Sequence, residues 1–234
     1  MITGASRGIG EAAARVLAGD GYDLFLVCRN SKEKIRQLGC ELEKTYGIYC
    51  ETAICDVSDA AQVETMIRQA GEVHVLINNA AISYVGLMTD MSLKQWHQVI
   101  DTNLNALFYT CRLVVPQMVQ RKEGKIVNIS SVWGNVGASM EVAYSTAKGG
   151  VNSFTRALAR ELAPSGVQVN GAAFGVIDTD MNACFSKEDM EALREEIPAD
   201  RIGTTMEAAE MIRQIINAPS YMTGQIITMD GGWT

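Results

Sequence analysis

The fold follows from one stretch near the start of the chain, Thr3-Gly4-Ala5-Ser6-Arg7-Gly8-Ile9-Gly10. It comes after a short apolar segment and leads into an alanine-rich helical pattern. Glycines at such a strand-to-helix turn let the backbone bend tightly and bring a cofactor phosphate to the helix N-terminus. The spacing Gly-x-x-x-Gly-x-Gly differs from the usual Gly-x-Gly-x-x-Gly fingerprint. The stretch predicts a dinucleotide site, and a glycine-rich turn without a ligand is the alternative.

Short β-branched runs and longer helical patterns alternate along the rest of the chain, which is typical of a parallel sheet covered by helices on both faces. Seven strands are predicted, at residues 1–3, 23–27, 49–54, 73–77, 125–129, 167–173 and 225–229. Helices are predicted at residues 10–19, 32–46, 60–69, 102–121, 143–163 and 206–217. Two capping boxes, Ser92 with Gln95 and Ser186 with Asp189, mark further helix starts. The sequence therefore predicts one α/β domain over residues 1–234, doubly wound and of Rossmann type.

The composition is that of a globular protein, since 47% of the 234 residues are hydrophobic, 20% are charged and only 4 are proline. Lysine and arginine number 20 against 27 aspartates and glutamates, and the resulting net charge of −7 disfavours nucleic acid as a partner. Apolar runs are shorter than the roughly 20 residues that a membrane span needs. The first residues lack the features of a signal peptide, so we expect a cytoplasmic protein that does not bind membranes.

Cysteine and histidine spacing favours neither a disulfide nor a metal site. Six cysteines are scattered along the chain without a Cys-x-x-Cys pair: Cys28, Cys40, Cys50, Cys55, Cys111 and Cys184. The two histidines, His74 and His97, do not form a His-x-x-x-His pair. We therefore expect reduced cysteines in a protein core and no metal ligands.

Two lengths along the chain are unusual for this fold. Residues 180–201 separate the sixth strand from the last helix, where a compact connection needs far fewer residues. This segment is interpreted either as a substrate lid or as a helical hairpin on the surface. The first strand has only two residues before Thr3, although it should be a buried central strand. We expect from this that residues preceding Met1 are missing.

The end of the second strand indicates the type of nicotinamide cofactor, because an acidic residue there holds a ribose 2′-hydroxyl whereas an arginine accepts a 2′-phosphate. Here the strand ends at Cys28 and Arg29 follows. Arg7 in the glycine turn could approach the same phosphate from the other side. The pattern predicts NADP(H), with Asp56 and Val57 beside the adenine. Two solvated arginines are the alternative.

A second wall of the cofactor site is predicted after the fourth strand, where the sequence reads Asn78-Asn79-Ala80-Ala81. Open α/β sheets bind ligands at the carboxyl ends of their strands. Taken alone, adjacent asparagines also suit an ordinary turn. Next to the glycine turn, we expect Asn79 and Ala80 to contact the cofactor.

Catalytic chemistry is predicted from Tyr144-Ser145-Thr146-Ala147-Lys148, because residues four apart share one face of a helix. A positive charge about 4 Å from the phenol, at an effective dielectric of about 20, contributes roughly 4 kcal/mol, or about 3 pKa units. We therefore expect Lys148 to lower the pKa of Tyr144 into a range useful for acid–base catalysis. Ser131 could hydrogen-bond the substrate oxygen, and Asn103 could hold a water or backbone group that links Lys148 to solvent.

From the glycine turn to the final Asp230-Gly231-Gly232, the sequence closely resembles the short-chain dehydrogenase/reductase family. The resemblance implies a catalytic tetrad of Asn103, Ser131, Tyr144 and Lys148. In it Tyr144 is the acid/base, Ser131 positions the carbonyl, Lys148 binds ribose and Asn103 maintains a proton relay, while hydride comes from the nicotinamide. It also implies a homotetramer, built by pairing of the predicted helices 102–121 and 143–163 and of the last strand.

Taken together, the motifs and the resemblance assign a set of cofactor contacts along the carboxyl edge of the sheet. The set is Gly4, Ser6, Arg7, Gly8, Ile9, Gly10, Arg29, Asp56, Val57, Asn79, Ala80, Tyr144, Lys148, Ile177 and Thr179. The chain departs from the family pattern at Phe174, where a proline usually lines the nicotinamide, and at Ala81, which replaces a common glycine. Phe174 is expected to reshape that wall.

Within the family, Arg7, the Arg201-Ile202-Gly203 turn and residues 221–225 resemble bacterial 3-oxoacyl-acyl-carrier-protein reductases. Residues 131–134 and 137–142 and the terminal Gly232-Trp233 also resemble the reductases that act on 5-aminopentanone-modified elongation factor P. The substrate is thus expected to be a ketone, either a small molecule or carrier-bound. A cofactor-binding scaffold without turnover is a third hypothesis, which the intact tetrad disfavours.

Charge near the mouth of the site should separate the two enzymatic hypotheses. An acidic carrier protein requires basic residues there, and Arg121, Lys122 and Lys125 are candidates. An aminopentanone requires an anion, and Glu141 lies one helical turn before Tyr144. Glu141 as a solvated loop residue is the alternative.

Overall fold

All seven strands lie in one parallel sheet, in the order β3-β2-β1-β4-β5-β6-β7. The computed structural model describes residues 1–234, with the side chains of all of these except residues 183 and 184. The strands are β1 (Ile2–Thr3), β2 (Leu24–Cys28), β3 (Cys50–Ile54), β4 (Val75–Asn78), β5 (Gly124–Ser131), β6 (Val167–Phe174) and β7 (Ile226–Met229). Each predicted strand is confirmed to within two residues at either end, and so is the doubly wound fold.

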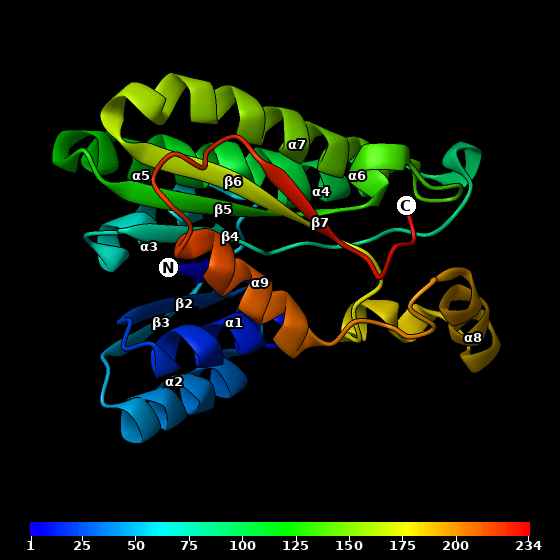
Figure 1. The fold of residues 1–234 in the computed structure, drawn as a ribbon, viewed down its shortest axis with the longest axis horizontal. Helices are drawn as coiled ribbons and strands as arrows, with labels where there is room; N and C mark the ends of the chain where they lie inside the picture. The colour runs from blue at the N-terminus through cyan, green and yellow to red at the C-terminus, as the bar shows by residue number, and fades with distance from the viewer.

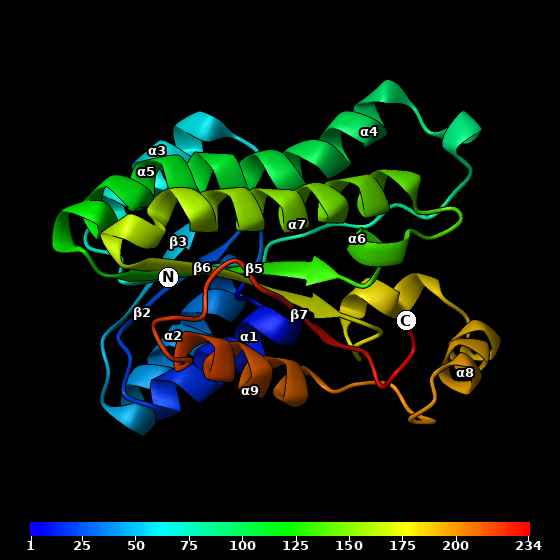
Figure 2. The ribbon, with the colours of Figure 1, turned by 45° about the horizontal axis from the view of Figure 1, so that its top comes forward.

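Two layers of helices cover the sheet (Figures 1 and 2). One face carries α1 (Gly8–Gly19), α2 (Lys32–Tyr46) and α9 (Thr205–Ile216), and the other carries α3 (Ala60–Ala70), α4 (Leu93–Ile100), α5 (Ala106–Arg121) and α7 (Val142–Leu162). Alternate residues of β2 enter the two resulting cores, with Leu26 on the α1 side and Phe25 and Val27 on the α3 side. Continuous apolar strands are expected when both faces of a sheet are covered.

The strand order reverses at β1, which pairs with β2 on one side and β4 on the other. Crossovers therefore leave the centre of the sheet in opposite directions, starting from the carboxyl ends of the adjacent strands β1 and β4. In sheets of this kind such a switch point is where a ligand enters.

The predicted helix 102–121 begins earlier than expected, and its course is interrupted. Helix α4 starts at Leu93, after the capping box of Ser92 and Gln95, and a π-helical turn over Asp101–Asn105 joins it to α5. Asn103 lies in that turn. The sequence pattern also missed α6 (Trp133–Val136) and the capping box of Thr204 and Glu207 that opens α9. Short 3₁₀ turns lie at Met88–Asp90, Ala163–Ser165 and Asp180–Cys184.

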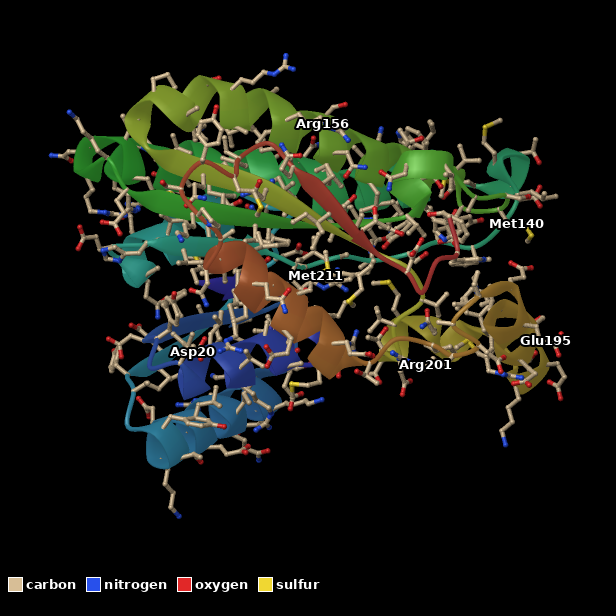
Figure 3. All side chains as sticks on the ribbon, viewed as in Figure 1. Asp20, Met140, Arg156, Glu195, Arg201 and Met211 are labelled. Carbon is tan, nitrogen blue, oxygen red and sulfur yellow. The ribbon has the colours of Figure 1, made fainter. Side chains whose placement is uncertain are left out.

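Residues 180–201, called the lid segment below, extend away from the sheet (Figure 1). They include α8 (Lys187–Glu196), which begins at the predicted capping box of Ser186 and Asp189 and buries no residue. Figure 3 shows Glu195 at the outer edge of the molecule and Arg201 where the segment returns toward α9. There Arg201 Nη2 lies 2.6 Å from Glu207 Oε1.

Within the described part of the chain, no helix is both long and apolar enough to cross a membrane. Among the same residues, no three His, Cys, Asp or Glu side chains come together as a metal site would require. Five cysteines are free thiols: Cys28, Cys40, Cys50, Cys55 and Cys111. The side chain of Cys184 lies outside the described residues.

Candidate active site

The glycine turn is packed so closely that side chains would not fit. Gly4 and Gly8 have φ values of 67° and 57°. A Cβ on Gly4 would lie 2.8 Å from the Cα of Ala80, and one on Gly10 would lie 2.6 Å from Asn79 Nδ2 and closer still to the carbonyl oxygen of Gly4. Helix α1 starts directly after the turn, and its N-cap residue Arg7 makes no side-chain cap. The N–H groups of this first turn and a glycine backbone without side chains fit the pyrophosphate of a dinucleotide.

Asn79 and Ala80 are confirmed as neighbours of that turn. Asn79 Nδ2 donates to the carbonyl oxygens of Thr3 (3.0 Å) and Gly4 (3.1 Å). The Thr3 hydroxyl accepts from the backbone N–H of Asn79 at 3.0 Å and of Ala80 at 3.1 Å. Thr3 was not among the predicted site residues, although a hydroxyl at the end of β1, one residue before the glycines, was visible in the sequence. Through these hydrogen bonds Thr3 connects the loop after β4 to the glycine turn.

Arg29 and Arg7 both lie in solvent, each beside a carboxylate. Arg29 Nη1 is 3.9 Å from Asp56 Oδ2, and their side chains are 44% and 32% exposed. Arg7 Nε is 3.8 Å from Asp180 Oδ2, with both side chains about two-thirds exposed (65% and 67%). Ion pairs this exposed contribute little free energy, so a phosphate can compete with the carboxylates for either arginine. Ser6 lies between the two regions, hydrogen-bonded to Cys28 at the end of β2.

The remaining predicted cofactor contacts also lie along the carboxyl edge. Val57 is buried after β3 and Ile177 is buried after β6. The side chain of Ile9, in the first turn of α1, packs against the core on the α1 side of the sheet. Thr179 reaches the glycine turn, because a Cβ on Gly8 would lie 3.3 Å from its methyl group. Phe174, expected to reshape the nicotinamide wall, is only 3% exposed and belongs to the core on the α1 side.

Ser131, Tyr144 and Lys148 come together where β5 ends against α7. Ser131 is the last residue of β5, and its side chain is hydrogen-bonded to Tyr144. Lys148 lies one turn along α7 from Tyr144, with its Nζ 5.5 Å from the centre of the phenol ring. Both are buried, at 9% exposure for Tyr144 and 2% for Lys148. The shared helix face predicted from the spacing is confirmed.

The predicted direction of the Tyr144 pKa shift is wrong for the protein alone. Burial raises the pKa of Tyr144, the Glu141 carboxylate raises it further, and the hydrogen bond from Ser131 only partly opposes them. Lys148 does not offset the burial, because its Nζ donates to the carbonyl oxygen of Ile129 at 2.7 Å and because burial lowers its own pKa to about 8. The helix spacing correctly predicts that Tyr144 and Lys148 lie close together. The direction of the Tyr144 pKa shift, however, is set by the free-energy cost of burying a charged phenolate away from water.

Asn103 is fixed by the backbone that follows β4. Its Oδ1 accepts from the N–H of Ile82 at 2.9 Å, and its Nδ2 donates to the carbonyl oxygen of Ile82 at 2.7 Å. The side chain is 1% exposed. The π-helical turn that interrupts the helix positions Asn103 for this paired contact, as such turns often do at functional sites. The backbone group that the amide holds is thus that of Ile82, and a link from it to Lys148 stays a prediction.

A buried polar network beneath the site was missed by sequence reasoning. Ser130 Oγ donates to Asn152 Oδ1 at 2.6 Å, and Asn152 Nδ2 donates to Asn135 Oδ1 at 2.9 Å. A Cβ on Gly134 would lie 2.7 Å from the carbonyl carbon of Lys148. Helix α6 therefore packs directly on the turn of α7 that carries Lys148. The sequence did offer a sign of this network, because a second polar residue, Ser130, directly precedes Ser131 at the end of β5.

Glu141 is half-buried near Tyr144, and its carboxylate affects the pKa of the phenol. Ser83 Oγ donates to Glu141 Oε2 at 2.9 Å, and the side chain of Trp133 is hydrogen-bonded to the same carboxyl group. Burial raises the pKa of Glu141. Glu141 is therefore a loop residue directly before α7, but one that is partly buried and hydrogen-bonded rather than fully solvated.

The basic residues proposed for the mouth of the site lie elsewhere. Lys125 is at the start of β5 and its amine donates to the carbonyl oxygen of Ile216, while Ser131 ends the same strand. Six residues of strand separate them by about 20 Å. Arg121 is bonded to Glu72 and to the backbone of Val73, at the same amino edge. Because β5 runs from Lys125 toward Ser131, these basic residues lie at the amino edge of the sheet, opposite the candidate active site.

Comparison of the chain with known proteins identifies one family. A model described as short chain dehydrogenase matches residues 1–190. The chain is 38% identical over 237 residues to the 3-oxoacyl-[acyl-carrier-protein] reductase FabG of Staphylococcus aureus (strain N315), covering 99% of this chain and 96% of that protein. It is 35% identical to an uncharacterized oxidoreductase, YmfI, of Bacillus subtilis (strain 168), covering 100% and 97%.

A solved structure is similar over the whole length. The crystal structure of a 3-oxoacyl-[acyl-carrier protein] reductase from Brucella melitensis superimposes with a TM-score of 0.93 at 31% identity, covering 100% of this chain and 90% of that one. The fold that carries the glycine turn and the pair of Ser131 and Tyr144 is thus shared with this reductase structure.

Proposed function

The chain belongs to the short chain dehydrogenase family, and on that premise we propose that it reduces a ketone to a secondary alcohol with NADPH. The observation that carries the proposal is the hydrogen bond between Ser131 and Tyr144 at the end of β5, with Lys148 one turn away. The glycine cradle lies on the same carboxyl edge of the sheet. A hydroxyl pair beside a dinucleotide site is the arrangement that ketone reduction needs.

The chemistry divides between the cofactor and the chain. When bound, NADPH supplies the hydride that reduces the carbonyl carbon. Ser131 holds the carbonyl oxygen by a hydrogen bond, and the phenol of Tyr144 donates the proton that completes the alcohol. Without the cofactor, burial raises the pKa of Tyr144, so the phenol is protonated near neutral pH but is a weak proton donor until its phenolate is stabilised. Lys148, whose amine donates to Ile129 in this structure, would bind the ribose of the cofactor and, with the cofactor bound, would stabilise the phenolate that remains.

The preference for NADPH over NADH rests on Arg29, supported by Arg7. Both guanidinium groups are exposed at the edge where the adenosine end of the cofactor belongs. Arg29→Ala should weaken NADPH binding by about 10-fold or more and leave NADH binding within about twofold, as expected for loss of a charge-assisted phosphate contact. The measurement is the dissociation constant of each cofactor by fluorescence titration. Equal losses for the two cofactors would remove the assignment.

A 3-oxoacyl group on acyl carrier protein is the leading candidate substrate. Support comes from the resemblance to such reductases along the chain, at 38% identity with the Staphylococcus aureus protein. The 5-aminopentanone group of modified elongation factor P is the second candidate. Glu141 favours it, because a half-buried carboxylate beside Tyr144 suits a substrate that carries an amine.

The first experiment measures NADPH oxidation with a small β-ketoester at 340 nm. The wild-type protein should turn over, and Tyr144→Phe should lower the rate by about 10²- to 10⁴-fold because it removes the proton donor. Cofactor binding by Tyr144→Phe serves as the control for folding. A wild-type protein that binds NADPH without oxidising it would establish a non-catalytic scaffold instead.

A second experiment separates the two protein-tethered substrates. Rates are measured with acetoacetyl carrier protein and with aminopentanone-modified elongation factor P, for the wild type and for Glu141→Gln. The amine hypothesis expects Glu141→Gln to raise KM for the aminopentanone alone. If both rates are unchanged by the substitution, amine recognition by Glu141 fails.

We extend the proposal to assembly and location. A cytoplasmic homotetramer is expected, with α5, α7 and β7 at its interfaces. Phe108 on α5 is 53% exposed and β7 is not fully buried, so both offer apolar surface to a second copy. Light scattering after size exclusion should give four times the chain mass of 25.4 kDa.

A further inference from the structure

The C-terminal residues 230–234, called the tail below, lie between the lid segment and the candidate active site. In both ribbon views the C-terminus lies between α6 and α8 (Figures 1 and 2). The tail is the continuation of β7, whose last residue Met229 accepts a hydrogen bond from the N–H of Gly175 at 3.0 Å. It is therefore anchored at the carboxyl edge of the sheet before it turns outward.

The tail is held in one conformation by the carboxylate of Asp230. Oδ1 accepts from the N–H of Gly232 at 2.9 Å, and Oδ2 accepts from the N–H and the hydroxyl of Thr234 at 2.9 and 3.0 Å. These bonds keep the pKa of Asp230 below its usual value although burial opposes them. The side chain between them, that of Trp233, is thus presented from a closed loop rather than from a free chain end.

On one side the tail contacts the base of the lid segment. The N–H of Ala199 donates to the carbonyl oxygen of Gly231 at 3.0 Å. A Cβ on Gly231 would lie 2.7 Å from the side chain of Ile197, so the two backbones are in close contact. The indole N–H of Trp233 donates to Glu196 Oε2 at 3.3 Å, at the last residue of α8.

On the other side Trp233 contacts the loop that follows Ser131. Its ring lies edge-on to Trp133, with ring centres 4.8 Å apart and planes at 62°. The backbone N–H of Trp133 donates to Ser131 Oγ at 3.2 Å. Trp133 is also hydrogen-bonded to Glu141. The pair of Trp233 and Trp133 therefore connects the end of α8 with the hydroxyl of Ser131, which is hydrogen-bonded to Tyr144.

We propose that Trp233 is a positioning residue of the candidate active site, which couples the lid segment to Ser131 through Trp133. Helix α8 buries no residue of its own, so its position depends on contacts at its base, and Trp233 supplies the largest apolar group there. Edge-to-face aromatic pairs are specific in geometry, and a displacement of α8 would therefore shift Trp133 and the hydrogen bond that it gives to Ser131. The effect on catalysis rests on the proposed ketone reduction, whereas the coupling itself does not.

Hydrogen exchange read by mass spectrometry tests the coupling without any substrate. Trp233→Ala should speed exchange about 3- to 10-fold in residues 187–199 and in residues 131–137 together, because loss of an aromatic pair loosens both partners. Trp233→Phe keeps the ring and should restore slow exchange in residues 131–137. Tyr221→Ala is the matched control, since Tyr221 is an aromatic side chain near the same end of the chain that is 99% exposed. Faster exchange in only one of the two segments, or in neither, overturns the coupling.

Kinetics then test positioning. Trp233→Ala should lower kcat about 10-fold with the dissociation constant of NADPH unchanged, and Trp233→Phe should recover most of the loss. A general structural defect would instead weaken NADPH binding and would lower kcat in both variants alike. Coupled exchange with an unchanged kcat overturns the positioning role. A wild-type protein that shows coupled exchange and no reductase activity refutes the proposed function and leaves the coupling established.

Discussion

Helices α7 and α8 are both amphipathic stretches of the same chain, yet they are held in place by different means. Helix α7 buries apolar and polar side chains alike, and Lys148, Asn152 and Thr155 find hydrogen-bond partners inside the protein. Helix α8 buries none of its residues, and its ion pairs from Arg194 to Glu191 and Asp200 lie on the surface. Buried networks resist displacement, whereas exposed ion pairs contribute at most about 1 kcal/mol each.

In the proposed ketone reductase, this difference would separate two tasks. Groups that exchange protons must be fixed to within a fraction of an ångström, and they lie on α7 and at the end of β5. Groups that admit a substrate must be able to move, and α8, which buries no residue, would suit that task if the lid segment covers the site. The predictions below challenge this division, beginning with the largest expected effect.

Lysine-to-methionine substitutions on the two helices should differ most. Lys148→Met should lower kcat about 10²- to 10⁴-fold, because a general acid loses the charge that stabilises its conjugate base. Lys187→Met on α8 should stay within about twofold of the wild type, as is usual for exposed positions. Steady-state NADPH oxidation is the readout, and circular dichroism checks the fold. A Lys148→Met protein with more than a tenth of wild-type kcat would contradict the assigned role.

Added methyl groups should distinguish the two packing environments. Gly134→Ala places a Cβ 2.7 and 2.8 Å from the backbone carbonyl of Lys148, which cannot move without shifting α7. Overpacking of this kind costs about 1–3 kcal/mol of unfolding free energy, measured by urea denaturation. The reverse change on α8, Ala192→Gly, should cost less than about 1 kcal/mol. Equal losses would mean that α6 and α7 are not tightly packed.

The stability of the cofactor-free protein should depend on the charge of Lys148. Burial lowers the pKa of this amine from 10.5 to about 8. Between these values the unfolded chain binds a proton that the folded protein has lost, so the contribution of Lys148 to unfolding free energy rises with pH. From pH 7.5 to 9.5 the gain should be roughly 2 kcal/mol.

Comparison with Lys148→Met isolates this gain in urea denaturation. The buried thiols Cys50, Cys55 and Cys111 have raised pKa values. They act in the opposite direction above pH 9, where unfolded thiols ionise and folded ones do not. The difference between wild type and variant cancels them. If the difference in unfolding free energy between the wild type and Lys148→Met did not change with pH, the Lys148 amine would be exposed to water in the folded protein.

The smallest effect is expected at the start of α8. Ser186→Ala removes the hydroxyl that accepts from the N–H of Asp189 at 3.0 Å. An N-cap stabilises its helix by about 1 kcal/mol. Exchange of amide hydrogens in residues 187–196 should quicken about 5-fold, while the urea midpoint stays unchanged because α8 opens independently. Ser186→Thr should retain the cap. A lowered urea midpoint would show that α8 unfolds together with the core.

The elements that the sequence predicts well are those decided by local patterns. β-Branched runs defined the strands, and a hydroxyl three residues before a glutamine or aspartate located the starts of α4 and α8. The spacing of Tyr144 and Lys148 gave their shared face. These features depend on neighbours within a few residues, which a sequence displays directly.

The elements that it missed depend on distant partners. The π-helical turn at Asn103 exists because its amide meets the backbone of Ile82, which lies 21 residues away. The sign of the Tyr144 pKa shift depends on burial, which helix spacing does not reveal. Lys125 was a candidate for the mouth of the site because of its charge, but the direction of β5 places it at the opposite end of the strand from Ser131.

The central place of β1 has a consequence for how the chain reaches its structure. Its residue Ile2 pairs with Leu26 on one side and with Ile77 on the other. During synthesis the second partner emerges from the ribosome some 75 residues after the strand itself, about 4 to 15 seconds later at ordinary elongation rates. Over that interval the nascent chain carries an unsatisfied apolar edge, and contacts of such long range slow the search for the native state. Substitutions in Met1–Thr3 should therefore slow this search as well as lower the stability of the folded protein, since Ile2 is fully buried.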